Sequence, residues 1–187
     1  MIALPLALFP ELQTPSLRLR QITQRDAEGL FQIFADPDVM NYYELSPFTS
    51  VQEANDLVAT ENSRYEKGLA IRWAITQLTY DRVIGTCGLV FNHDNHSANL
   101  GYDLARPYWR HGIMSEALQL VIRFSFRSLK VNRLEALVLK DNIPSIRLLE
   151  KMAFQLEGTL RQYALLKGLF QDMECYSLLK IDYDRQP

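Results

Sequence analysis

The chain has 187 residues, of which 48% are hydrophobic and 22% are charged, which is typical of a globular protein with one sizeable core. Its 20 Lys and Arg residues nearly balance 22 Asp and Glu residues, which argues against general nucleic-acid binding because such proteins carry a basic surface. The two cysteines, Cys87 and Cys175, lie far apart and outside any CxxC spacing, and no apolar stretch is long enough to span a membrane. These features predict a cytoplasmic protein with free thiols and with no nucleic-acid or membrane partner.

The first elements in chain order are predicted to be a strand and a helix. Residues 16–22, SLRLRQI, alternate polar and apolar side chains, as half-buried strands do. Thr23 and Asp26 then form a capping-box pattern at the start of a helix. This helix is expected to end at Asp36-Pro37, because the residue before a proline avoids the helical conformation.

The rest of the chain alternates helices with groups of strands. A second helix is expected from Ser50 to about Lys67, with Gly68 as its stop. Strand-like runs are expected at residues 70–78, 82–91, 97–105, 133–139, 154–165 and 173–181. A third helix is expected to open at Gly112, and a fourth helix is expected at residues 142–152. This order predicts one α/β domain whose mixed sheet is covered by helices.

The stretch PYWRHGIMSEA, residues 107–117, places Gly112 among basic residues at the start of the third helix. The first turn of a helix carries unpaired N–H groups and a partial positive charge, and glycine lets a ligand approach the backbone. Amides from about Arg110 to Ser115 therefore suit a phosphate or pyrophosphate. The pattern is neither GxxxxGK[ST] nor GxGxxG, which disfavours a nucleotide-hydrolysing loop and a Rossmann site. A plain strand-to-helix turn explains the spacing equally well.

The fourth helix begins within DNIPSIRLLEKMAF, residues 141–154. Asn142 suits the N-cap position, and Pro144 is tolerated in the first turn. The Ser145 hydroxyl would then lie near the helix N-terminus, where it can donate to a developing anion such as a leaving thiolate. A structural role in starting the helix also accounts for both Asn142 and Ser145.

Two long segments, LGYDLARPYWRHGIMSEAL and VNRLEALVLKDNIPSIRLLEKMAFQLEGTLR, together resemble the GNAT acetyltransferase superfamily. Within it, the chain is similar to the RimJ/RimL-type branch of ribosomal-protein N-terminal acetyltransferases, and the earlier LRLRQIT, IRWAITQ and VIGTCGL fit the same branch. The resemblance implies an N-terminal extension at residues 1–14 and one GNAT domain at 15–187. It further implies a mixed, mostly antiparallel sheet of about seven strands with about four helices, splayed around an acetyl-CoA site.

The resemblance assigns the CoA pyrophosphate to backbone amides of six consecutive residues: Arg110, His111, Gly112, Ile113, Met114 and Ser115. The pantetheine arm would pair with the strand around Leu104, and Asn142 and Ser145 match the family's N-x-x-S near the thioester. The turn departs from the usual Q/R-x-x-G-x-G/A, since Arg110 replaces a glycine and Met114 replaces a small residue. Because backbone amides hold the pyrophosphate, these departures are compatible with binding.

The resemblance also implies direct transfer of the acetyl group to an amine, with no metal. Many members carry a tyrosine on the fourth helix as the acid for the CoA thiolate; Leu149 stands there, which leaves Ser145 as the candidate. The attacking amine must be neutral, so a carboxylate or an ordered water has to take its proton. Asp103 and Glu135 are the candidate bases, although a structural hydrogen bond or a solvated charge would explain each equally well. Glu44 is a candidate to face the acceptor amine.

More than one kind of acceptor amine is compatible with the sequence. The resemblance favours the N-terminal α-amine of a protein, and a small amine such as a polyamine, an amino acid or an antibiotic is the alternative. A sensor that binds acyl-CoA without catalysis also remains, because the helix tyrosine is missing. A peptide acceptor would need an open groove between residues 42–49 and the last strands, whereas a polyamine would favour a closed, acidic pocket. The sequence leaves a homodimer open.

Overall fold

The computed structural model describes residues 8–43 and 45–185. Within them, eight strands form one sheet in the order β1-β2-β3-β4-β5-β6-β8-β7. The strands are β1 Leu12–Gln13, β2 Leu17–Gln21, β3 Ala70–Gln77, β4 Tyr80–Asn92, β5 Ser97–Leu104, β6 Arg133–Leu139, β7 Gln155–Leu166 and β8 Leu169–Leu179. Neighbours are antiparallel except β5 and β6, which are parallel. The predicted mixed, mostly antiparallel sheet is confirmed; the additional strand is the two-residue β1, which lies within the predicted N-terminal extension.

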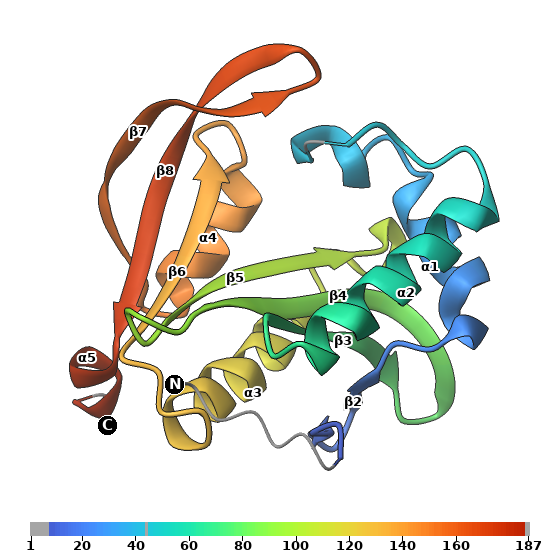
Figure 1. Cartoon of the computed structure of the whole chain (residues 1–187), viewed down its shortest axis with the longest axis horizontal. Coiled ribbons are helices and arrows are strands. Elements are labelled where there is room, and N and C mark those ends of the chain that lie inside the picture. The colour runs from blue at the N-terminus through green and yellow to red at the C-terminus, as the bar shows by residue number, and fades with distance from the viewer. Residues whose placement is uncertain (1–7, 44, 186–187) are drawn as a thin grey trace.

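Two pairs of helices cover the sheet, as Figure 1 shows. The first pair, α1 (Ala27–Phe34) and α2 (Val51–Glu66), packs on Ala74 and Val83 of the sheet in a smaller core. The other pair, α3 (Ile113–Arg127) and α4 (Ile143–Lys151), belongs to the main core around Trp73. These are the four helices expected from the sequence. The five-residue α5 (Lys180–Asp184) was not predicted.

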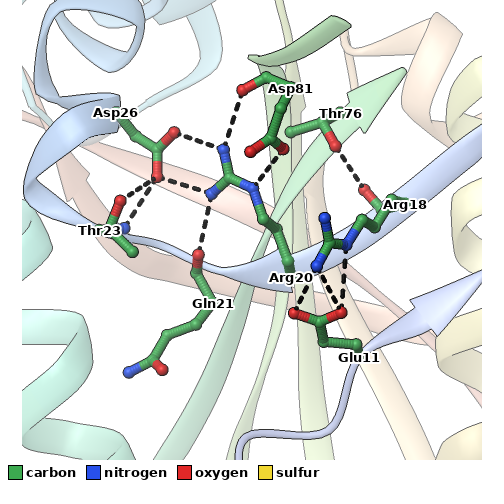
Figure 2. Close-up of polar contacts among 8 residues, drawn as sticks. All are labelled: Glu11, Arg18, Arg20, Gln21, Thr23, Asp26, Thr76 and Asp81. Carbon is green, nitrogen blue, oxygen red and sulfur yellow. Dashed lines mark hydrogen bonds and ion pairs between the residues drawn. The ribbon is translucent and has the colours of Figure 1, made fainter. Parts of the chain in front are cut away.

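The start of the first helical segment is tied to the sheet by Arg20 of β2 (Figure 2). The Arg20 guanidinium donates to both carboxylate oxygens of Asp26 at 2.8 Å and to Asp81 at 2.6 Å. Asp26 also accepts the Thr23 backbone N–H at 2.8 Å, which completes the predicted capping box. Burial alone would raise the pKa of Asp26, but the hydrogen bonds from Arg20 and Thr23 hold it below its ordinary value.

The sheet divides between its two parallel strands. β5 and β6 pair at only three positions, from Ser97–Arg133 to Asn99–Glu135. Beyond them, β5 continues to Leu104 beside β4, whereas β6 follows β8 along its whole length. Figure 1 shows β5 crossing the middle of the molecule while β6 rises away from it. One edge of β5 is therefore left open beyond Asn99.

The final two strands differ from the prediction in their bounds. The sequence suggested that the last strand covers 173–181, but β8 begins at Leu169 and ends where α5 starts. Lys167 and Gly168 have φ values of +48° and +83°, so two residues suffice to reverse the chain between β7 and β8. This tight turn extends the hairpin into residues expected to form a loop.

Candidate active site

The open edge of β5 presents backbone groups of Tyr102 and Leu104. The N–H of Ala105 donates to Ile84 of β4 at 2.8 Å. Because the backbone groups of a strand alternate between its two edges, those of Tyr102 and Leu104 point into the split. An extended chain bearing amides, such as a pantetheine arm, can pair with such an edge as an added strand does. The Leu104 carbonyl on this edge already accepts the indole N–H of Trp109 at 2.6 Å, and the pairing of Leu104 with a pantetheine arm stays a prediction.

The turn that opens α3 follows directly after β5. Arg110 and Gly112 both adopt left-handed conformations, with φ of +63° and +78°. Gly112 is the N-cap and provides no side-chain cap, and the Glu116 N–H makes the first bond of the helix, to the Gly112 carbonyl at 3.0 Å. A Cβ added at Gly112 would meet no described protein atom within 4 Å. The amides of residues 113–115 therefore remain available to an anion, and the space beside Gly112 admits one.

Side chains around this turn are arranged in keeping with an anion site. Arg110 and His111 are exposed, whereas Met114 is buried in the main core. The unusual methionine therefore packs inward and leaves its amide to the ligand side. Lys151 of α4 donates to the Ser115 hydroxyl at 3.4 Å, which brings a further cation beside the turn.

The start of α4 has the predicted cap. The Asn142 carboxamide oxygen accepts the Ser145 N–H at 3.3 Å. The Ser145 hydroxyl lies 2.7 Å from the hydroxyl of Tyr102 on β5. Leu149, at the position of the family's tyrosine, is fully buried in the core. Sequence reasoning missed Tyr102, because a tyrosine within a strand carries no signal of its own.

Asp103, one of the two candidate bases, is enclosed on the face of the sheet that α2 covers. Its carboxylate accepts the Thr86 hydroxyl at 2.6 Å, the Thr86 N–H at 3.0 Å and the Tyr43 hydroxyl at 3.1 Å, and it pairs with Arg72 at 3.3 Å. Arg72 also lies 3.7 Å from Glu61 of α2. Burial raises the pKa of Asp103, against the lowering effect of Arg72 and the hydrogen bonds. With a side-chain exposure of 0%, Asp103 is better placed to hold the Tyr43 loop than to meet an amine.

Glu135, the other candidate base, lies where β5 and β6 separate. It pairs with Asn99 at the last position that joins the two strands. Its side chain is 35% exposed and lies 3.2 Å from Arg133. Since Leu134 and Ala136 are buried in the core that contains α3 and α4, the alternation of β6 directs Glu135 to the opposite face. A partly exposed carboxylate at this point can take up a proton, directly or through water.

Three hydrogen bonds link residues 40–42 with the turn between β7 and β8 and with the residue before the N-cap of α4. Lys167, in the turn between β7 and β8, donates to the carbonyls of Met40 and Asn41 at 3.2 and 3.4 Å. The Tyr42 hydroxyl donates to the Asp141 carbonyl, just before α4, at 3.3 Å. These contacts cross the region where an N-terminal peptide would need an open groove. Glu44, the candidate to face the acceptor, lies outside the described residues.

Two further properties of the described chain bear on function. Among residues 8–43 and 45–185, no three or more His, Cys, Asp or Glu side chains gather in a way that could hold a metal ion. In the same part of the chain, none of the helices combines the length and the apolar character needed to cross a bilayer.

Known proteins of the same fold have related sequences. Residues 16–155 match the family model described as acetyltransferase (GNAT) domain. The protein named uncharacterized N-acetyltransferase p20, from Bacillus licheniformis, is 43% identical over 173 residues, which cover 92% of this chain and 97% of that protein. The [ribosomal protein uS5]-alanine N-acetyltransferase of Escherichia coli (strain K12) is 25% identical over 182 residues, or 92% of each chain. A structure of RimL, the ribosomal L7/L12 alpha-N-protein acetyltransferase, in complex with coenzyme A has a TM-score of 0.82 at 23% identity, covering 91% of this chain and 98% of that one. The chain therefore belongs to the GNAT family of acetyl-CoA-dependent N-acetyltransferases.

Proposed function

We propose that the protein transfers the acetyl group of acetyl-CoA directly to the N-terminal α-amine of a protein. The observation that carries the proposal is the split between β5 and β6, which leads to the uncapped first turn of α3. The E. coli relative, named for the alanine of ribosomal protein uS5, aligns over most of both chains and supports a protein N-terminus as the acceptor.

The donor is held mainly by backbone groups. Leu104 pairs with the pantetheine arm along the open edge of β5, and amides from Arg110 to Ser115 bind the pyrophosphate. Asn142 fixes the first turn of α4 and so places the Ser145 hydroxyl beside the thioester. Ser145 stabilises the departing thiolate by a hydrogen bond.

The acceptor nitrogen attacks the carbonyl carbon of the thioester. A C–N bond forms, the C–S bond breaks, and its electron pair leaves with sulfur. The amine loses a proton, which Glu135 accepts directly or through a water molecule. Glu135 is preferred to Asp103 because its side chain is 35% exposed, whereas every oxygen of the Asp103 carboxylate is engaged inside the protein.

The burial and pKa of both cysteine thiols favour direct attack by the amine over a covalent acetyl-cysteine intermediate. Cys87 is fully buried, and burial raises its pKa well above the ordinary value. Partial burial also raises the pKa of Cys175. Neither thiol is prepared to form a covalent acetyl intermediate at neutral pH, because the thiolate is the nucleophilic form.

A small amine is the second candidate acceptor. The contacts of Lys167 and Tyr42 with the opposite half of the molecule narrow the route that a peptide would take. A polyamine or an amino acid would need no such opening. These contacts are the specific observation that favours the second candidate.

The first test is calorimetric titration of the folded protein with acetyl-CoA, CoA and ATP. We expect micromolar or tighter binding of acetyl-CoA and much weaker binding of ATP. Peptides with free Ala or Ser N-termini, the same peptides with blocked N-termini, polyamines and amino acids are then compared as acceptors by mass spectrometry.

Each outcome of the acceptor comparison has a separate meaning. Acetylation of free but not of blocked peptides supports the proposal, and acetylation of small amines alone supports the second candidate. Binding of acetyl-CoA without transfer to any amine would indicate a sensor. If folded protein binds no acetyl-CoA, the proposed donor site is wrong.

A further inference from the structure

The hydroxyls of Tyr102 and Ser145 join the two structural elements that flank the split. Tyr102 lies on β5, three residues beyond the last position paired with β6. Its side chain packs against the main core, to which α3 and α4 also contribute, and its hydroxyl is 2.7 Å from Ser145 in the first turn of α4. Neither neighbour of Tyr102 on β5 can replace this contact, because Gly101 has no side chain and Asp103 points to the opposite face.

The direction of this hydrogen bond decides what Ser145 can do. Each hydroxyl has one proton to donate and can also accept. A phenol is a stronger acid than an aliphatic alcohol, so donation from Tyr102 to the Ser145 oxygen is the favoured direction. The single proton of Ser145 is then free to point elsewhere. Burial raises the pKa of Tyr102 to about 12, which keeps the phenol protonated throughout the neutral range.

We propose that Tyr102 is a positioning residue for catalysis: its phenol donates to the Ser145 oxygen and thereby directs the Ser145 proton at the sulfur that leaves acetyl-CoA. This inference rests on the proposed function, since it assigns Ser145 to the thioester. No proton is transferred between the two hydroxyls. The sulfur leaves with the electron pair of the broken C–S bond and is stabilised by the Ser145 hydrogen bond until it takes a proton from solvent.

The arrangement explains how one serine can act without a neighbouring tyrosine on its own helix. A free serine hydroxyl can rotate among three staggered positions and can donate to nearby carbonyls as readily as to a ligand. The Tyr102 phenol holds the Ser145 oxygen from one side, and Asn142 holds the main chain of Ser145. Together these two contacts remove most of the rotational freedom of the hydroxyl. The gain is expected in turnover, because the thiolate charge develops only in the transition state.

The test uses the full chain and four variants: Tyr102→Phe, Ser145→Ala, the double variant, and Tyr80→Phe as a control. Tyr80 lies at the start of β4 and is 74% exposed. We expect Tyr102→Phe to lower kcat about tenfold, the effect of one lost hydrogen bond, with a less than about twofold change in the calorimetric Kd of acetyl-CoA. Ser145→Ala should lower kcat at least as much, and the double variant should match Ser145→Ala. The control should keep the turnover of the unmodified protein.

The double variant separates positioning from a role in packing. If removal of the Tyr102 hydroxyl lowers kcat equally with and without Ser145, Tyr102 acts independently of the serine and the inference fails. Unchanged turnover in Tyr102→Phe also overturns it. In both cases the unmodified protein still binds acetyl-CoA and acetylates its acceptor, so the proposed function stands. If the unmodified protein does not bind acetyl-CoA, both the proposed function and this inference are refuted.

Discussion

The indole N–H of Trp109 donates to the carbonyl oxygen of Leu104 at 2.6 Å. This bond ties the turn that opens α3 to the end of β5. In the proposed complex, β5 holds the pantetheine arm and the turn holds the pyrophosphate. The Trp109 side chain therefore fixes the binding surface for the pantetheine arm relative to the binding surface for the pyrophosphate.

Replacing Trp109 with Phe should weaken acetyl-CoA binding with little effect on folding. Phenylalanine keeps an aromatic side chain but lacks the indole N–H, so the turn is no longer held to Leu104 by this bond. We expect a roughly fivefold increase in the Kd of acetyl-CoA, corresponding to about 1 kcal/mol for one hydrogen bond. Calorimetry provides the Kd, and thermal unfolding checks the fold. An unchanged Kd in a folded variant would show that the bond does not shape the donor site.

Gly112→Ala and Gly168→Ala form a matched pair. Both glycines have positive φ, +78° and +83°, and an added Cβ would meet no described protein atom within 4 Å at either position. Each substitution should therefore cost a similar ~1–2 kcal/mol of stability through the left-handed backbone. Only at Gly112 would the methyl group occupy the proposed pyrophosphate space. The Kd of acetyl-CoA should rise at least about tenfold in Gly112→Ala and stay unchanged in Gly168→Ala. Equal affinities in the two variants would place the pyrophosphate elsewhere.

The Arg20–Asp26 pair should make stability depend on pH in the acid range (Figure 2). The folded state lowers the pKa of Asp26 below its ordinary 3.8, so the ionised carboxylate stabilises the fold above that pH. Asp26→Asn should cost about 3 kcal/mol at pH 7, since it breaks a buried ion pair. Below pH 3.8 the difference from the unmodified protein should shrink, because Asp26 is then protonated first in the unfolded chain, and the remaining stabilisation is lost as the pH falls through the lower folded pKa.

Urea unfolding at pH 7 and pH 3 measures this difference. Asp81→Asn is the control, because Asp81 binds the same arginine with a side chain that is 64% exposed. Exposed ion pairs contribute little, so it should cost no more than ~1 kcal/mol. Equal costs for the two substitutions would contradict the assignment of Asp26 as the buried anchor.

The sequence was sufficient for features set by local pattern. The caps at Ser50 and Asn142, the strand at 133–139 and the glycine that opens α3 follow from propensities that act over a few residues. The hairpin turn at Lys167-Gly168 could not be predicted in this way, because a lysine gives no sign that it will adopt a left-handed backbone. The last strand was consequently expected to begin too late.

Contacts between distant parts of the chain were beyond the reach of local pattern. Asp103 looked equally suited to catalysis and to structure until the fold placed Arg72, 31 residues away, beside it. The pairing of Tyr102 with Ser145 joins residues 43 apart and depends on the β5–β6 split. The first contact arises from the order of β3, β4 and β5 in the sheet, and the second from the packing of α4 beside β5. A single sequence encodes neither in any short segment.

Lys167→Asn should separate the two candidate acceptors. Asparagine tolerates the left-handed conformation of Lys167, but its short side chain cannot reach the carbonyls of Met40 and Asn41. A peptide that enters between these segments must break the Lys167 contacts, so their removal should lower the KM of a peptide acceptor roughly threefold to fivefold, as expected for about 1 kcal/mol. Tyr42→Phe, which removes the contact with Asp141, should act in the same direction.

The Kd of acetyl-CoA should stay constant in both variants, because the hydrogen bonds of Lys167 and Tyr42 go to none of the residues proposed to hold the donor. Stability should fall by no more than ~1 kcal/mol, the net contribution of the hydrogen bonds that each substitution removes. A raised KM for peptides would mean that Lys167 and Tyr42 are part of the peptide site. A lowered KM for peptides, with no change for polyamines, would mean that the contacts of Lys167 and Tyr42 restrict the entry of a protein N-terminus. Breaking these contacts would then be part of acceptor binding.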